Sequence, residues 1–325
     1  MTKANVYVTK PLPPEALALL REHCEVEVNF SGVLPKDELL EKLKGRDAVV
    51  VVGGTPIDDE VCQAVKAHCK IFSVHGVGYN NVDIAAATKA GILVSYTPEV
   101  VTDATADLAW TLMMSAARRV VECDKFVRSG QKGWGPTNMI GTQISGKTLG
   151  IMGGGRIGTA VGERGIGFKM RIIYTDVQPN PVFEAATGGK FVDKETLLKE
   201  ADFISIHTPL LPSTRHFMST NEFKMMKPTA IFVNAARGPV VDEKALVAAL
   251  KSGEIAGAGL DVFEFEPNLE PGLAELDNVV LTPHIGTSTM DTRIQMGELC
   301  ARNVFAALEG QVPPTCLNPE VLKGR

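Results

Sequence analysis

Residues 150–158 read Gly150-Ile151-Met152-Gly153-Gly154-Gly155-Arg156-Ile157-Gly158, an apolar strand pattern that runs into a glycine-rich turn and then into a helix. Gly153 allows a tight turn, Gly155 lets the backbone approach a ligand, and Gly158 lets the helix pack closely against the strand. Because these three glycines lie between a strand and a helix, the stretch predicts a dinucleotide-binding unit.

Two neighbouring features support this prediction. The backbone amides at the helix start, near Arg156 and Ile157, lack partners within the helix and favour phosphate groups, helped by the helix dipole. Asp176 ends the next predicted strand, where a carboxylate accepts hydrogen bonds from the adenosine ribose and repels a 2′-phosphate. Residues 177–179 carry no basic side chain. We therefore expect NAD(H) rather than NADP(H).

Composition places the chain among ordinary globular proteins. Its 325 residues suffice for two domains, and 45% are hydrophobic while 22% are charged. A net charge of −5 argues against nucleic acid as a partner. No apolar run is long enough to span a membrane, and the N-terminus has no signal-peptide pattern, so a cytoplasmic location is expected.

The cysteines are scattered, and no CxxC pair occurs. Free thiols are therefore expected, and no His/Cys cluster has the spacing of metal ligands, so no metal site is predicted. The six cysteines are Cys24, Cys62, Cys69, Cys123, Cys300 and Cys316.

Short β-rich runs alternate with helical segments both before and after the glycine turn. This alternation predicts parallel sheets covered on both faces by helices. Strands are expected at 6–8, 26–28, 47–52, 70–74, 92–94, 148–152, 171–175, 203–207, 230–234, 256–260 and 279–281. Helices are expected at 14–22, 36–43, 58–66, 83–89, 104–118 and 287–308.

The late position of the glycine turn predicts two domains. A dinucleotide-binding turn opens its own domain, so the residues before it must form another, flavodoxin-like domain. We expect a discontinuous substrate domain at 1–102 plus 286–325 and a Rossmann NAD-binding domain at 103–285. The apolar helix at 104–118 is typical of a core helix or of a subunit interface, and a Gly/Pro-rich arm follows at 130–141.

Three segments in the second half of the chain place ionisable residues after predicted strands: Arg237 in the first, Asp261 and Glu266 in the second, and His284 in the third. The carboxyl ends of parallel strands are where such sheets bind ligands. A histidine donates a proton at neutral pH, a carboxylate orients it, and an arginine binds a substrate carboxylate and polarises the adjacent carbonyl. Beside a dinucleotide, this set indicates hydride transfer to a 2-oxo acid.

Each of these residues has an ordinary structural interpretation when it is taken alone. An arginine after a strand is usually a surface ion pair, a glutamate before proline is usually a solvated loop acid, and a histidine after proline is often a turn residue. Only their joint occurrence favours chemistry. His23, His68 and His216 lie in ordinary helix or loop contexts.

Six segments of the sequence, spread over essentially the whole chain, resemble segments of a known enzyme family. The chain resembles the D-2-hydroxyacid dehydrogenases, most closely the glyoxylate/hydroxypyruvate reductase branch. The segments that carry the resemblance are 76–83, 102–109, 150–158, 233–242, 260–267 and 283–286. The resemblance implies NADH-dependent reduction of glyoxylate or hydroxypyruvate to the D-2-hydroxy acid.

The resemblance also implies roles for individual residues. Arg237 corresponds to the residue that binds and polarises the substrate, His284 to the acid/base, and Glu266 to its partner. The backbone at Val77 and Gly78 corresponds to the loop that takes the substrate carboxylate. The cofactor set that the resemblance implies comprises Thr105, Gly153, Gly155, Arg156, Ile157, Gly158, Asp176, His207, Pro209, Thr214, Ala235, Asp261 and Gly286.

A homodimer is also implied. In the reductase branch a tryptophan from the partner's arm can reach the active site, and Trp134 is the candidate here; simple interface packing is the alternative. Asn80 and Asp107 stand where the family more often has Asp and Glu. The remaining alternatives for function are a phosphoglycerate dehydrogenase and an NADH-sensing, corepressor-like binding protein.

Overall fold

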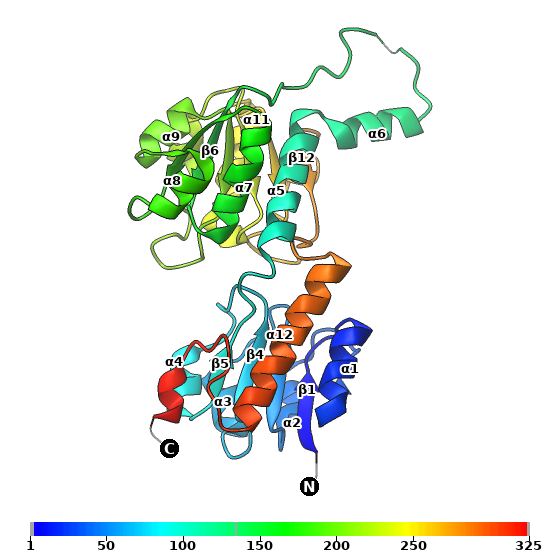
Figure 1. Cartoon of the computed structure of the whole chain (residues 1–325). Coiled ribbons are helices and arrows are strands. Elements are labelled where there is room, and N and C mark those ends of the chain that lie inside the picture. Colours follow the sequence, from blue (N-terminus) through cyan, green and yellow to red (C-terminus); the bar gives the residue numbers. More distant parts are fainter. Residues whose placement is uncertain (1–2, 134, 324–325) are drawn as a thin grey trace. The chain divides into compact units, whose positions relative to one another are not determined.

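The computed structural model describes residues 3–133 and 135–323, and the chain divides into two compact units (Figure 1). The first unit combines the residues up to Val101 with those from Thr287 onward. The second runs from Thr102 to Gly286. Each unit has its own sheet, and each is described by itself.

The first unit is built on a five-stranded, all-parallel sheet with the strand order β2-β1-β3-β4-β5. This is the flavodoxin-like order, in which helices cover both faces of the sheet. Its strands are β1 (Ala4–Val8), β2 (Cys24–Val28), β3 (Ala48–Val52), β4 (Ile71–His75) and β5 (Leu93–Ser95). Its helices are α1 (Pro14–His23), α2 (Lys36–Leu43), α3 (Asp59–Val65), α4 (Ile84–Lys89), α12 (Met290–Leu308) and η2 (Pro319–Leu322).

The last α-helix, α12, packs against the sheet of the first unit. Figure 1 shows α12 lying beside α1 and β4, and its residues Cys300, Ala301 and Val304 enter the core formed by β1, β3 and α1. A Cβ added at Gly297 would overlap the Cβ of Ala16, so the glycine permits the close crossing of the two helices. The C-terminal segment therefore completes a hydrophobic core that the first hundred residues leave open on one face.

The second unit is built on a seven-stranded, all-parallel sheet with the order β12-β11-β10-β9-β6-β7-β8. The order reverses between β6 and β9, which is the switch point of a Rossmann fold. Its strands are β6 (Thr148–Met152), β7 (Arg171–Thr175), β8 (Lys190–Phe191), β9 (Phe203–Ile206), β10 (Ile231–Asn234), β11 (Gly257–Leu260) and β12 (Val279–Leu281). Its helices are α5 (Thr102–Ala117), α6 (Val120–Arg128), α7 (Arg156–Gly167), α8 (Pro181–Thr187), α9 (Lys194–Glu200), α10 (Thr220–Met225), η1 (Gly238–Val240) and α11 (Glu243–Ser252).

The predicted fold class, two doubly wound α/β domains with a Rossmann domain inserted in a flavodoxin-like one, is confirmed by these strand orders. Some helix ends differ from the prediction. Helix α5 begins at Thr102 rather than at residue 104. Helix α12 begins at Met290, because Thr289 caps it and accepts a hydrogen bond from the Thr292 amide at 3.3 Å.

Helix α6 is not among the helices predicted from the sequence. It spans Val120–Arg128, directly before the Gly/Pro-rich arm, and none of its residues is buried. Its apolar residues Val120, Val121 and Val127 are exposed. Figure 1 shows α6 projecting from the body of its unit. Its apolar residues Val120, Cys123 and Val127 recur at helical spacing, so the sequence carries an amphipathic pattern here although the helix buries no residue within its own chain.

Within the described residues no helix is long and apolar enough to cross a membrane, and no cluster of three His, Cys, Asp or Glu residues could hold a metal ion. All six cysteines are free thiols.

His75, the last residue of β4, is a buried polar residue in the first unit and is 5% exposed. Neither of its ring nitrogens has a hydrogen-bond partner in the part of the chain that the structure describes. Burial lowers the pKa of His75 to about 4, and the positive charge of Arg293 acts in the same direction. The fold therefore holds this ring in its neutral form.

This burial makes stability depend on pH. The pKa of His75 lies below the ordinary value of about 6.5, so between these values the unfolded chain binds a proton that the folded chain does not. The contribution of His75 is complete above about pH 6.5 and is lost as the pH falls toward about 4. Replacing His75→Gln should remove about 2 kcal/mol of the loss between about pH 7.5 and about pH 5, measured by urea unfolding. Equal losses in the two proteins would contradict the prediction.

Candidate active site

The glycine turn between β6 and α7 is closed by backbone contacts. Gly153 has a φ of 97°, and its amide donates to the carbonyl of Thr175 at 2.9 Å. A Cβ there would lie 2.9 Å from the carbonyl of His207, and a Cβ at Gly158 would overlap the Gly153 carbonyl oxygen. A Cβ at Gly155, by contrast, would meet no atom within 4 Å. The turn is therefore tightly packed on one side and open on the side from which a phosphate would approach.

Asp176 is fixed by this same turn. Its carboxylate accepts hydrogen bonds from the amides of Gly154, at 2.8 Å, and Val177, at 2.7 Å. The Asn180 side chain donates to the Gly154 carbonyl at 2.8 Å. An ionised carboxylate has about four acceptor positions. Two of them thus hold the acid against the turn.

His284 and Glu266 form a pair. The Nδ1 atom of His284 lies 3.0 Å from Oε2 of Glu266, and the other oxygen of Glu266 accepts from the Phe263 amide at 3.0 Å. Burial acts to raise the pKa of Glu266, but the hydrogen bond and charge of His284 outweigh it and the pKa is lowered. An ionised carboxylate only accepts, which assigns the proton between the two groups to Nδ1 and leaves Nε2 for another partner.

Asp261 holds the turn that carries His284. It is 1% exposed, and its carboxylate accepts from the Thr282 hydroxyl at 2.6 Å and from the Ile285 and Gly286 amides at 2.8 Å each. Burial raises the pKa of Asp261 even though these three hydrogen bonds act against the rise. His284 has a φ of 53°, in the left-handed region, and these bonds keep the backbone there.

Arg237 follows β10. Its Nη1 donates to the carbonyl of Ala236 at 2.6 Å. Burial lowers the pKa of Arg237, and the negative charge of Glu266 opposes this change. Because the ordinary pKa of arginine is above 12, the guanidinium stays charged. A Cβ on the next residue, Gly238, would overlap the Phe263 carbonyl, so the loop of Arg237 lies directly against the turn that ends in Glu266.

The strands explain why these residues meet. Strands β10, β11 and β12 are neighbours and parallel, so Arg237, Asp261 and His284, which follow them, lie at one edge of the sheet. The glycine turn follows β6 and reaches the same edge, two strands from β10. The second unit therefore brings an arginine, a histidine–carboxylate pair and the glycine turn to one edge.

The remaining predicted residues lie in different places. Thr105 is beside Gly286, since a Cβ on that glycine would lie 3.7 Å from the threonine hydroxyl. Ala235 follows β10 and is buried. His207 follows β9, and its Nε2 lies 2.8 Å from the Ser205 hydroxyl; burial lowers its pKa although part of the residue is exposed.

Thr214 closes its own loop, since its hydroxyl donates to the Pro209 carbonyl at 2.6 Å and accepts from the Leu211 amide at 2.8 Å. Val77 and Gly78 follow β4 in the first unit. Trp134 falls outside the residues that the structure describes.

Comparison with known proteins matches residues 110–286 to the D-isomer specific 2-hydroxyacid dehydrogenase, NAD binding domain. A relative from Thermococcus onnurineus, named glyoxylate reductase, is 47% identical over 99% of this chain and 98% of that relative. The chain belongs to the D-isomer specific 2-hydroxyacid dehydrogenase family. It is an NAD-dependent oxidoreductase of that family.

Solved structures of the family superimpose on nearly the whole chain. A protein of Thermus thermophilus aligns with a TM-score of 0.91 at 44% identity, covering 96% of this chain and 99% of that one. A glyoxylate reductase from Paecilomyes thermophila aligns with a TM-score of 0.87 at 35% identity, covering 98% and 99%. The similarity thus extends over both units and is not confined to the NAD-binding domain.

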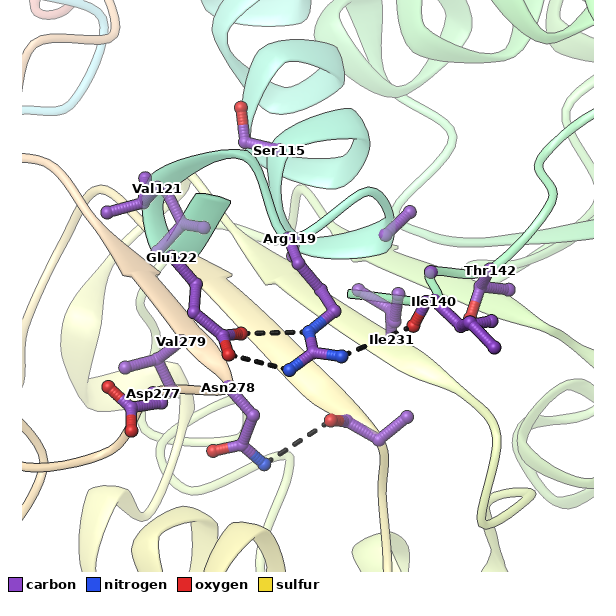
Figure 2. Close-up of a pocket in the computed structure, with 15 residues that line it drawn as sticks. Ser115, Arg119, Val121, Glu122, Ile140, Thr142, Ile231, Asp277, Asn278 and Val279 are labelled. Atoms are coloured by element: carbon purple, nitrogen blue, oxygen red, sulfur yellow. Dashed lines mark hydrogen bonds and ion pairs between the residues drawn. The ribbon is translucent and has the colours of Figure 1, made fainter. Parts of the chain in front are cut away.

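In this dehydrogenase a cavity of about 440 Å³ lies away from the residues above (Figure 2). It is lined where strands begin, at Ile231 and Val279, and by α5, α6 and the end of the arm. Figure 2 shows Arg119 and Glu122 facing each other in it, joined by hydrogen bonds of 2.8 and 2.6 Å. Because it lies at the amino ends of the strands, it is separate from the candidate active site.

A methyl group added at Gly158 and one added at Gly155 should have different effects, because one position is closely packed and the other is open. Gly158→Ala should lower the free energy of unfolding by roughly 1–3 kcal/mol, because its Cβ overlaps the Gly153 carbonyl. Gly155→Ala should leave stability nearly unchanged and should weaken NADH binding, because its Cβ points into the open side. Thermal melting and fluorescence titration with NADH measure the two effects. Unchanged stability in Gly158→Ala would contradict the close packing.

Proposed function

We propose that this dehydrogenase reduces a small 2-oxo acid, glyoxylate or hydroxypyruvate, with NADH and forms the D-2-hydroxy acid. The observation that carries the proposal is the His284–Glu266 pair, 3.0 Å apart, at the sheet edge where Arg237 and the glycine turn also lie. The relatives named glyoxylate reductase, 44–48% identical over nearly their whole length, support this substrate class.

His284 is the proposed proton donor. Bound NADH supplies a hydride to the carbonyl carbon of the substrate. The carbonyl oxygen, which gains negative charge, takes the proton from Nε2 of His284. Glu266 holds Nδ1 and thereby sets the ring orientation, and its carboxylate stabilises the ring while it carries the positive charge.

Arg237 is the proposed substrate anchor. A guanidinium offers two parallel N–H groups to a carboxylate, which fixes the acid end and polarises the adjacent carbonyl. The backbone amides at Val77 and Gly78 are also proposed to bind the substrate carboxylate. The first unit, taken as 1–102 plus 286–325, is then the substrate domain, and residues 103–285 form the NAD-binding domain.

The residues proposed to bind NAD(H) lie on the second unit. Gly153, Gly155 and Gly158 shape the turn for the pyrophosphate, and Asp176 takes the ribose. The others proposed for the cofactor are Thr105, Arg156, Ile157, His207, Pro209, Thr214, Ala235, Asp261 and Gly286. For Asp261, three hydrogen bonds already occupy its oxygens, so at most one acceptor position remains for a nicotinamide carboxamide.

A homodimer is proposed as the working assembly, in the cytoplasm. The exposed valines of α6 support it, because an amphipathic helix that buries nothing in its own chain offers a face to a second copy. Trp134, on the arm that follows α6, is proposed to reach the partner's active site.

Turnover tests the proposed reaction. NADH oxidation, followed by absorbance, should be fast with glyoxylate or hydroxypyruvate and slower with pyruvate, 2-ketogluconate and 3-phosphohydroxypyruvate. His284→Ala should lower kcat by roughly 10²–10⁴-fold, the usual contribution of a general acid, and leave NADH binding nearly unchanged. NADH binding without turnover of any of these acids would instead support a sensing protein. Undiminished kcat in His284→Ala would refute the assignment of the proton donor.

Cofactor preference tests Asp176. The wild-type protein should favour NADH over NADPH, because a carboxylate accepts from a ribose hydroxyl and repels a phosphate. In Asp176→Asn the side chain keeps an acceptor for the Gly154 amide but loses its charge, so the preference should fall by about tenfold or more. The ratio of kcat/KM values for the two cofactors measures it. An unchanged ratio would mean that another residue reads the ribose.

A further inference from the structure

Two buried glutamates bind each other's backbone beside the active site. Glu243, the first residue of α11, is 1% exposed, and the side chain of Glu264 is 5% exposed. The Glu264 amide donates to Oε1 of Glu243 at 2.6 Å, and the Glu243 amide lies 3.4 Å from Oε2 of Glu264. The start of α11 and the turn after β11 are thereby joined at a point where little water enters.

The other oxygen of Glu264 reaches a third segment. Oε1 of Glu264 lies 2.6 Å from Nε2 of His216 and 3.1 Å from Nη2 of Arg215. His216 has a φ of 52°, and its amide donates to the Pro239 carbonyl at 2.9 Å. His216 lies in a loop, as expected, and its ring contacts a carboxylate whose side chain is 5% exposed.

The two glutamates of this cluster have different neighbours. Burial raises the pKa of Glu243, which has no basic side chain within ion-pair distance in the described structure. Glu264, by contrast, faces a guanidinium and an imidazole. Hydrogen bonds between a carboxylate and such cationic groups are about twice as strong as neutral ones, so the contacts of Glu264 are the stronger ones in the cluster.

The cluster lies next to the proposed catalytic groups. Glu264 is two residues before Glu266, and the Phe263 amide between β11 and Glu264 donates to the Glu266 carboxylate at 3.0 Å. A Cβ at Gly238, the neighbour of Arg237, would overlap the Glu264 amide nitrogen. On the far side, Arg215 directly follows Thr214, in the loop proposed for the cofactor.

We propose that Glu264 is a positioning residue that ties the loop at residues 207–217 to the turn carrying Glu266, and through Glu266 sets the orientation of His284. The inference rests on the proposed function and deepens it. The Phe263 and Glu264 amides of the 263–266 turn donate to the carboxylates of Glu266 and Glu243. The Glu264 side chain adds a third attachment, to Arg215 and His216. Releasing Glu264 frees that turn, and the Glu266 carboxylate no longer meets Nδ1 in one geometry.

The test begins with Glu264→Gln, which keeps the size of the side chain and removes its charge. It should lower kcat for 2-oxo acid reduction by about tenfold, the change expected from one weakened charge-assisted contact. Glu200→Gln is the matched control, because Glu200 pairs with Arg171 at 2.6 Å on the surface of the same unit. That control should keep full activity. Wild-type kcat in Glu264→Gln would overturn the proposal.

A double-mutant cycle separates positioning from general destabilisation. If Glu264 acts through Glu266, Glu264→Gln should have no further effect on kcat in a Glu266→Gln background. Effects that multiply in the double variant would refute the coupling. His216→Asn, which tolerates a positive φ, tests the same link from outside the turn if Glu264→Gln does not fold. It should lower kcat in the wild-type background and not in Glu266→Gln.

These outcomes are distinct from those that test the reaction. A wild-type protein that does not oxidise NADH with any 2-oxo acid would contradict the proposed function itself. A wild-type protein that turns over normally, with an equally active Glu264→Gln variant, would contradict only the role of Glu264.

Discussion

The parallel alignment of β6 and β9 to β12 is the constraint on which the candidate active site depends. Every strand in this sheet points the same way, so residues that follow different strands are collected at one edge although they lie far apart in the sequence. The glycine turn, Arg237 and His284 come together for this reason. A single antiparallel strand in the middle of the sheet would send one of them to the opposite edge.

Buried carboxylates then hold the turns that carry the residues of the candidate active site. Asp261 uses three hydrogen bonds to hold the turn that carries His284, and Glu264 is held from two other segments beside Glu266. A carboxylate removed from water is costly unless its oxygens are bonded, so each of these acids favours one backbone arrangement around it. The Asp261 carbonyl also accepts a hydrogen bond from the His284 amide at 2.8 Å, so the backbone that carries the His284–Glu266 pair is held by acids outside the pair.

The cavity at the amino ends of the strands lies apart from the candidate active site (Figure 2). Its lining includes the paired Arg119 and Glu122 and the end of the exposed arm, and it holds none of the proposed catalytic groups. The groups proposed for the chemistry follow the carboxyl ends of the strands instead, where the cofactor itself would form part of the site. A choice of active site based only on the presence of a cavity would therefore have selected the amino ends of the strands.

The sequence alone determined the strand–turn–helix at 150–158, the βα alternation, and Arg237, Glu266 and His284 as the ionisable residues that follow strands. These follow from local rules, since a glycine turn, a strand pattern and a residue after a strand are contiguous in the chain. Helix α6 was not predicted although its apolar residues recur at helical spacing, because it follows α5 without an intervening strand and so lies outside the βα alternation. Glu264 was not singled out either, although it lies in the segment that contains Glu266. Its partners Arg215, His216 and Glu243 are distant in sequence, and only the tertiary structure, by packing three loops together, decided that they meet.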